Sequence, residues 1–304
     1  MKQVILWIIV IVILQACTTT KPTEKVKTTT VPSKNENLDE HKNIQKIALI
    51  VGVSDYAGER NDLNGIYKDV NNMKKLFAQL GFKTVVLYNS DSINIVKYLN
   101  KYEKNLSSKD FFTFYYSGHG SHVEDISGDE KDGQDETLVL SDGTVNISLV
   151  DDTLDRSFAH IKARKLMIFD SCHSGTASKA LNGKTQSKTI SSKAITMSFP
   201  ILEGEVGYEE LKNSGEYIVL SSSQDNEESL ATPKGSLFTT SFCEAVLDED
   251  KKLKSFNELI KLVTNKIMIH CNKEKSIPHH PQIASSKSSL KDSNIQNYLS
   301  SKSN

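Results

Sequence analysis

The stretch Lys165-Leu-Met-Ile-Phe-Asp-Ser-Cys-His-Ser-Gly175 is the part of the sequence from which the fold can be argued. Its apolar run, Leu166 to Phe169, predicts a buried strand, and the run ends abruptly in small and polar residues with a cysteine among them. Cys172 is therefore expected on a loop just past the C-terminal end of that strand. In open α/β sheets, loops at this end of the strands form the crevice where ligands bind.

A second stretch shows the same order of features. Phe111-Phe-Thr-Phe-Tyr-Tyr116 predicts a strand rich in aromatic residues, and Ser117-Gly-His-Gly120 follows it directly. If the two strands are neighbours in one sheet, the imidazole of His119 and the thiol of Cys172 emerge side by side. A histidine there can lower the pKa of the thiol and later protonate a departing amine.

Each motif also has a simpler explanation. A single cysteine after a strand is more often a small buried hydrophobic residue than a nucleophile, and Gly-His-Gly is usually only a turn. The two motifs together favour catalysis, because both follow strands, both are flanked by glycines, and 53 residues separate His119 from Cys172. That spacing is close to the roughly 50 residues given for caspases.

Tyr116-Ser-Gly-His-Gly120 and Asp170-Ser-Cys-His-Ser-Gly175 together resemble the signature pair of metacaspases, the caspase-like cysteine peptidases of bacteria, plants, fungi and protozoa. The resemblance covers about residues 44–300. It implies an α/β fold, the caspase-like three-layer α/β/α arrangement with a central, mostly parallel sheet. It also implies a cysteine endopeptidase with a dyad of His119 and Cys172, and no cofactor required for the chemistry.

The hydrophobic pattern predicts alternating strands and helices, which implies parallel βαβ units with helices on both faces of the sheet. Continuous aliphatic or aromatic runs indicate strands at 46–53, 84–88, 111–116, 166–169 and 217–221, and the resemblance adds a final strand at 279–283. Apolar residues at helical spacing predict helices near 66–80, 92–106, 154–163, 235–246 and 256–269. Cys243 is expected in the core.

The resemblance also implies roles for residues around the dyad. Asp69 and Asp170, with Ser117 nearby, are expected to line a pocket for the substrate's basic side chain, so that cleavage follows Arg or Lys. Without the resemblance, the favoured interpretation of Asp69 would be a solvated helix carboxylate. The backbone amides of Gly120 and Cys172 are expected to hold the oxyanion. Family members often have a cysteine where this chain has Ile66, so the pocket wall differs here.

An acidic loop, Glu124 to Glu136, raises the question of calcium, since carboxylate-dense loops suit Ca²⁺. The loop lacks the spacing of an EF-hand, and such loops are also often simply solvated. The resemblance implies an activating Ca²⁺ site at Asp135, Asp151 and Asp152. A further aspartate of the family site is replaced by Lys179, a cation that disfavours the metal, so both interpretations stay open.

A long polar segment, 176–214, corresponds to the family's linker, in which self-cleavage can occur. Four of its lysines would be acceptable to an acidic pocket: Lys179, Lys184, Lys188 and Lys193. We therefore expect the chain to cut itself after one of these lysines.

The N-terminus has the form of an export signal. Residues 1–16 comprise Lys2 and an apolar run that is too short for a comfortable membrane span. Leu14-Gln-Ala-Cys17 resembles a bacterial lipobox, which implies lipidation of Cys17 and attachment to the cell envelope membrane, the outer membrane in a Gram-negative host. An uncleaved anchor is the alternative. Residues 17–43 read as a flexible tether, and 44–300 as the peptidase domain.

Composition excludes several classes of function. A net charge of −1 gives no electrostatic case for binding nucleic acid, and the four cysteines show neither metal-like spacing nor a disulfide framework. The expected partners are protein or peptide substrates and a membrane, and we expect a monomer. Two rivals remain open: a binding or scaffold protein on an inactive peptidase fold, and a caspase-like peptidase of different specificity.

Overall fold

The computed structural model describes residues 43–90, 92–125, 133–172, 186–198, 215–224, 227–248 and 255–300. The predicted signal peptide, Cys17, most of the tether, Lys179 and Lys184 lie outside these ranges. No helix within them is long and apolar enough to cross a membrane.

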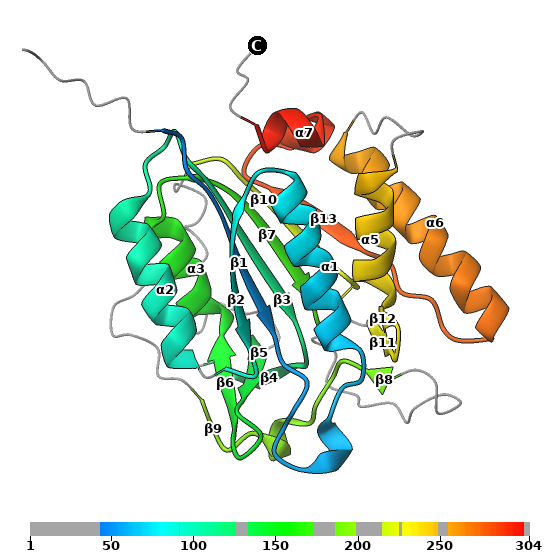
Figure 1. Ribbon diagram of the computed structural model, residues 1–304. Helices are drawn as coiled ribbons and strands as arrows, with labels where there is room; N and C mark the ends of the chain where they lie inside the picture. Colours follow the sequence, from blue (N-terminus) through cyan, green and yellow to red (C-terminus); the bar gives the residue numbers. More distant parts are fainter. Residues whose placement is uncertain are drawn as a thin grey trace, which may run out of the picture. The chain divides into compact units, whose positions relative to one another are not determined.

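The described elements alternate between strands and helices over most of the chain (Figure 1). The strands are β1 (Lys46–Gly52), β2 (Lys83–Tyr88), β3 (Phe111–Ser117), β4 (Gly120–Glu124), β5 (Gln134–Ser141), β6 (Asn146–Val150), β7 (Arg164–Asp170), β8 (Gln186–Ser187), β9 (Met197–Ser198), β10 (Tyr217–Ser221), β11 (Leu230–Thr232), β12 (Gly235–Ser236) and β13 (Gln282–Ser285). The helices are α1 (Ile66–Gln79), α2 (Ser92–Asn105), α3 (Asp151–His160), α5 (Leu237–Leu247), α6 (Phe256–Glu274) and α7 (Ile295–Tyr298), with 3₁₀ turns η1 (Glu59–Asn61), η2 (Ser192–Ala194) and η3 (Ser288–Asp292).

The central sheet has six strands in the order β13-β10-β7-β3-β1-β2. All neighbouring pairs are parallel except β10 and β13, which are antiparallel. The predicted α/β fold with a mostly parallel sheet is therefore confirmed. Parallel strands put their C-terminal ends at one edge of a sheet, so the segments after β3 and β7 leave the sheet together.

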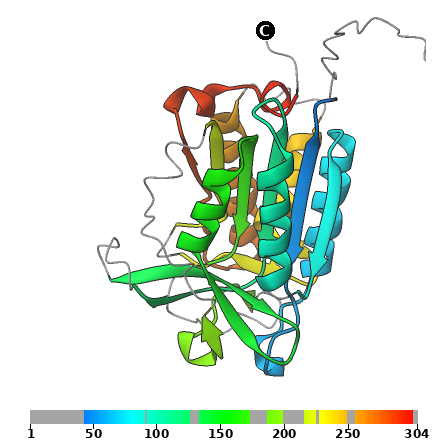
Figure 2. The same cartoon turned by 90° about the vertical axis from the view of Figure 1, so that its left-hand side faces the viewer.

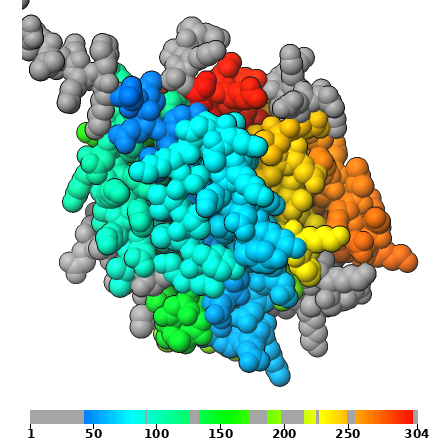
Figure 3. All heavy atoms as spheres, viewed as in Figure 1, coloured from blue at the N-terminus to red at the C-terminus, as the bar shows by residue number. Residues whose placement is uncertain are grey.

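Helices cover both faces of this sheet and produce two apolar cores. Ala48 and Ile50 of β1 face α1, α5 and α6, whereas Leu49 and Val51 face α2 and α3. This alternation is what a strand buried on both faces requires. Figure 1 shows α1 and the α5–α6 pair lying side by side over one face of the sheet, and their atoms (cyan, yellow and orange) form neighbouring parts of the surface in Figure 3.

A second, four-stranded sheet, in the order β4-β5-β6-β9, was not anticipated from the sequence. Figure 2 shows its green strands projecting from the end of the central sheet where β3 and β7 stop. Its strands mix polar and apolar residues, and the longest aliphatic run in them is only Leu138 to Leu140, so the sequence gave no clear strand pattern. Part of the predicted acidic loop belongs to it, because Glu124 ends β4 and Asp135 lies in β5.

Three boundaries also differ from the sequence prediction. Helix α3 begins at Asp151 rather than Leu154, because two aspartates in its first turn favour a helix N-terminus. The last strand begins at Gln282, after the histidine pair. Within the linker, residues 186–198 form β8, η2 and β9 instead of a structureless loop.

Candidate active site

The two sequence motifs meet because their strands are paired in register. Strands β3 and β7 are neighbours, and Ser117 is the partner of Asp170. His119 and Cys172 each follow two residues later, at the same edge of the sheet. The expected juxtaposition of the two strand ends is therefore present.

An acidic pocket lies beside these strand ends and is filled by the side chain of Lys188, from the linker. The Lys188 ammonium is 2.8 Å from Asp170 Oδ1 and 3.9 Å from Asp69 Oδ2, and all three side chains are fully buried. It also donates to Ser117 Oγ at 2.8 Å and to the Asp170 carbonyl at 2.9 Å. The three residues predicted to bind a basic side chain thus surround a lysine of the same chain.

The pKa values of the two carboxylates are shifted in opposite directions. Burial disfavours charge on Asp170, but the adjacent Lys188 ammonium and hydrogen-bonding hydroxyls hold its pKa below the ordinary value. Burial raises the pKa of Asp69 to about 6 and the like charge of Asp170 adds to this, although the Lys188 ammonium, 3.9 Å away, acts in the opposite direction. Asp170 is therefore the main counter-ion of the bound ammonium.

The peptide group after Lys188 lies against the predicted oxyanion donors. Its carbonyl oxygen accepts hydrogen bonds from the Gly120 N–H at 2.9 Å and from the Cys172 N–H at 3.4 Å. These are the two amides predicted to hold a negatively charged oxygen. A single residue, Lys188, therefore contacts both the acidic pocket and this pair of amides.

Cys172 is fully buried beside the same peptide group. Its sulfur accepts the Ser229 N–H at 2.6 Å, and its thiol faces the Ser229 carbonyl at 3.4 Å. Burial raises the pKa of the Cys172 thiol to about 12, although the Thr189 hydroxyl and the Ser229 and Lys188 backbones act in the opposite direction. The thiol is consequently neutral while the linker occupies the cleft.

His119 is held by groups from the loop that precedes α1. Its Nε2 is 2.7 Å from the Asn61 carbonyl, which fixes the ring, and its N–H donates to Tyr56 Oη at 2.7 Å. Nδ1 is buried and makes no hydrogen bond within the described residues. Burial lowers the pKa of His119 to about 4, against opposing contributions from the Asn61 and Lys188 carbonyls.

These two environments differ from the expectation that His119 lowers the pKa of the Cys172 thiol. With both groups buried, the thiol keeps its proton and the imidazole stays neutral, since burial penalises either charge. The Lys188 carbonyl accepts the N–H of Cys172 and that of Gly120, the residue after His119, so both motifs lie against the Lys188–Thr189 peptide bond.

Several polar residues around the pocket were missed from the sequence. Ser229 Oγ and Thr239 Oγ1 donate to Asp170 at 3.0 Å and 2.6 Å, and Ser236 donates to Asp69 through its N–H and its hydroxyl. These serines and threonines occupy unremarkable polar sequence. Ser229 precedes β11, Ser236 lies in β12 and Thr239 in α5, so only the long-range packing of this segment against Asp69 and Asp170 identifies them.

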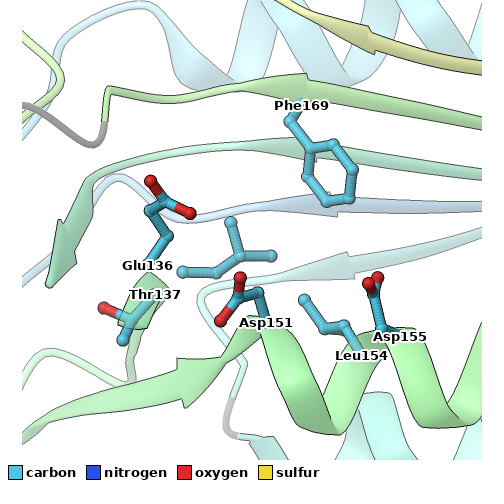
Figure 4. Close-up of a pocket in the computed structure, with 7 residues that line it drawn as sticks. Glu136, Thr137, Asp151, Leu154, Asp155 and Phe169 are labelled. Carbon is cyan, nitrogen blue, oxygen red and sulfur yellow. The ribbon is translucent and has the colours of Figure 1, made fainter. Parts of the chain in front are cut away.

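One of the predicted calcium ligands, Asp151, lines a separate cavity. It has a volume of about 120 Å³ and is lined by Glu136, Thr137, Leu138, Asp151, Leu154, Asp155 and Phe169 (Figure 4). Burial, then the nearby carboxylates of Glu136 and Asp155, raises the pKa of Asp151 to about 8.

The predicted trio of Asp135, Asp151 and Asp152 does not fit a metal ion as it stands. Among the described residues, no group of three or more His, Cys, Asp or Glu side chains is arranged to hold one. The remaining acidic residues of the loop, 126–132, and Lys179 lie outside those ranges. Calcium activation therefore stays a prediction from the resemblance.

Comparison with known proteins matches this architecture to a family. The sequence profile of the caspase domain matches residues 45–292. The chain belongs to the caspase domain family. Two solved structures agree with this caspase fold: a Geobacter sulfurreducens protein (TM-score 0.62, 21% identity, covering 83% of this chain and 98% of that one) and caspase-1 of Spodoptera frugiperda (0.51, 16%, 79% and 86%).

Curated relatives of this caspase domain are metacaspases. Metacaspase-1 of Kluyveromyces lactis is 30% identical over 208 residues, which are 64% of this chain and 45% of the relative. Metacaspase-1 of Pyricularia oryzae is 34% identical over 145 residues, 43% of this chain and 36% of the relative. The chain thus spans less than half the length of these relatives. The predicted kinship with metacaspases is confirmed.

Proposed function

We propose that this chain is a cysteine endopeptidase that cleaves after lysine or arginine, using Cys172 and His119. One observation carries the proposal: Lys188 lies with its ammonium 2.8 Å from Asp170 and its carbonyl on the amides of Gly120 and Cys172. A substrate lysine bound in the same way would present its carbonyl carbon to the Cys172 sulfur.

The proposed reaction proceeds by acyl transfer. The Cys172 sulfur attacks the carbonyl carbon after the bound lysine, and His119 accepts the thiol proton. The oxygen becomes an anion on the Gly120 and Cys172 amides. The C–N bond then breaks as His119 gives its proton to the departing amine, which leaves a thioester. Water, deprotonated by His119, hydrolyses the thioester and restores the thiol.

The pocket supports the proposed specificity by charge. Two buried carboxylates face one ammonium, and an uncharged or acidic side chain would leave them unpaired at a large desolvation cost. An arginine side chain is also cationic and has several N–H donors for the two carboxylates, so we expect it to bind in the same pocket.

The same contacts support self-processing at one bond of the linker. Of the two linker lysines that the structure describes, Lys188 fills the acidic pocket, whereas Lys193 is exposed in η2. We therefore assign the proposed self-cleavage to the Lys188–Thr189 bond.

One observation favours the rival function, a caspase-fold binding protein with weak or no catalysis. The cleft is filled by the chain's own linker, and both proposed catalytic groups are neutral there. Hydrolysis requires that the linker leaves or is cut.

The test is hydrolysis of fluorogenic peptides ending in Lys, Arg or Asp by the full chain, with and without Ca²⁺. We expect turnover after Lys and Arg, and a loss of about 10⁴-fold or more in Cys172→Ala, because the nucleophile is gone. Turnover after Asp alone would contradict the pocket assignment. Inertness of the wild type in every condition, with an intact linker, would favour the binding protein.

A further inference from the structure

The linker pairs with other strands on both sides of the Lys188 bend, which defines a register for substrates. Ser187 and Gln186 pair antiparallel with Leu230 and Ala231 of β11. Beyond Lys188, Thr189 forms a parallel bridge to Gly120 of β4. Such backbone pairing binds many sequences equally, so any further selectivity must come from side chains.

Gln186, the third residue before the proposed scissile bond, has its amide bound at both ends by backbone groups. Its Oε1 accepts the Asn64 N–H at 2.8 Å, and its Nε2 donates to the Asp62 carbonyl at 2.9 Å. The Asn64 N–H can only donate a hydrogen bond, and the Asp62 carbonyl can only accept one. A glutamate there has no hydrogen for the Asp62 carbonyl, and a lysine has no acceptor for the Asn64 amide.

Ile190, the second residue after the bond, is held on the other side of Cys172. Its side chain is 3% exposed and belongs to the apolar core on the α2 and α3 face of the sheet. Its N–H donates to the Gly120 carbonyl at 3.1 Å, and its carbonyl accepts from Ser121 Oγ at 3.0 Å. The next residues, Ser191 to Lys193, are exposed, and contact resumes only at Ala194, so Ile190 is the last buried side chain close to the proposed scissile bond.

We propose that the cleft selects substrates by two side chains besides the basic one: an uncharged amide at the third residue before the cleaved bond, and an aliphatic group at the second residue after it. The preferred substrate class is therefore peptides of the form Gln-x-Lys-x-Ile. This inference rests on the proposed peptidase function and adds its sequence selectivity.

The amide site also bears on the rate, because one loop serves both sites. Asp62 and Asn64 bind the amide, and Asn61, directly before them, holds the His119 ring. A substrate that binds Asp62 and Asn64 fixes the loop that positions His119. Loss of the amide contact is thus expected to lower kcat as well as raise KM.

The experiment uses internally quenched peptides cut by the full chain. One contains Gln-Ser-Lys-Thr-Ile, a second replaces Gln by Glu, and a third replaces Ile by Asn. A fluorogenic lysine amide, which has no residue after the bond, reports the basic activity. We expect each replacement to lower kcat/KM by about tenfold or more, since sites built for a particular contact reject analogues that lack it. Competition from the linker affects all peptides alike and cancels in the ratios.

A second measurement uses the linker itself. Gln186→Glu should slow self-cleavage relative to wild type by a similar factor. If the docked linker keeps added peptides out of the site, this comparison alone tests the proposed selectivity. If kcat/KM agrees within twofold for all three peptides, or self-cleavage within twofold for wild type and Gln186→Glu, the proposed selectivity is wrong. The proposed peptidase function would not be affected. No hydrolysis of the lysine amide and no self-cleavage would instead overturn the proposed function.

Discussion

At the scale of single residues, Lys188 unites the two halves of the candidate site. Its ammonium pairs with Asp170, and its carbonyl occupies the two amides expected to hold the oxyanion. Lys193, five residues later in the same segment, is exposed and makes no contact with the pocket carboxylates among the described ion pairs. The two lysines form a matched pair for a test.

We expect Lys188→Gln to slow self-cleavage by at least about 100-fold, because a neutral side chain leaves two buried carboxylates unpaired. Lys193→Gln should cut at the wild-type rate. Gel electrophoresis gives the rates, and N-terminal sequencing of the smaller fragment should begin at Thr189. Cys172→Ala is the inactive control. A fragment with another first residue, persisting in Lys188→Gln, would refute the assignment.

At the scale of elements, the start of α1 and the β11–β12 turn fit together closely at Gly65. Gly65 adopts a left-handed conformation, with φ of 87°. A Cβ there would collide with the Thr232 carbonyl oxygen, in the turn that leads to Ser236. This contact keeps Asp69, on α1, in reach of the Ser236 N–H and hydroxyl.

Gly65→Ala should destabilise the fold by roughly 3 kcal/mol, from left-handed strain and steric overlap together. Gly215→Ala is the matched control, because Gly215 has φ of 95° but open space around its Cβ position. That variant should lose only about 1 kcal/mol. Thermal denaturation measures both, and equal losses would mean that the helix–turn contact does not constrain the fold.

At the scale of the whole molecule, buried carboxylates on α3 make stability depend on pH. Burial, and the neighbouring Asp152, raise the pKa of Asp155 to about 7, from an ordinary value of 3.8. The folded state then binds more protons than the unfolded state between these values. Stability from this group is present below about pH 4 and is lost as the pH rises through about 7.

Asp155→Asn should therefore raise Tm by a few degrees at pH 8 and change it little at pH 5, with EDTA present to exclude divalent cations. Asp142→Asn should show the opposite sign at pH 8. Hydrogen bonds from Thr144 and Val145 lower the pKa of Asp142, so its ionised form is the stabilising one. Denaturation at both pH values checks the pair, and a Tm rise for Asp155→Asn at pH 5 alone would contradict the expectation.

The sequence predicted five strands of the central sheet because they are continuous apolar runs, and it predicted the place of His119 and Cys172 because both follow such runs. The sixth strand, β13, was expected from the resemblance alone, since Gln282-Ile-Ala-Ser285 is no such run. It did not predict the second sheet, whose strands mix polar and apolar residues and are formed by pairing with one another. Nor could it identify the Asn61 carbonyl behind His119, since a backbone group has no sequence pattern. The choice of Lys188 among four lysines depends likewise on long-range pairing with β4 and β11.

The docked linker lowers the apparent affinity of the site for any free peptide or inhibitor. A tethered ligand acts at an effective concentration in the millimolar range, so a free peptide with identical contacts would have to exceed that concentration to replace it. Cutting the chain after Lys188 would release one of the two attachments of the linker. Inhibitors ranked on uncut protein would then look weak, and the same compounds would gain potency once the chain is nicked.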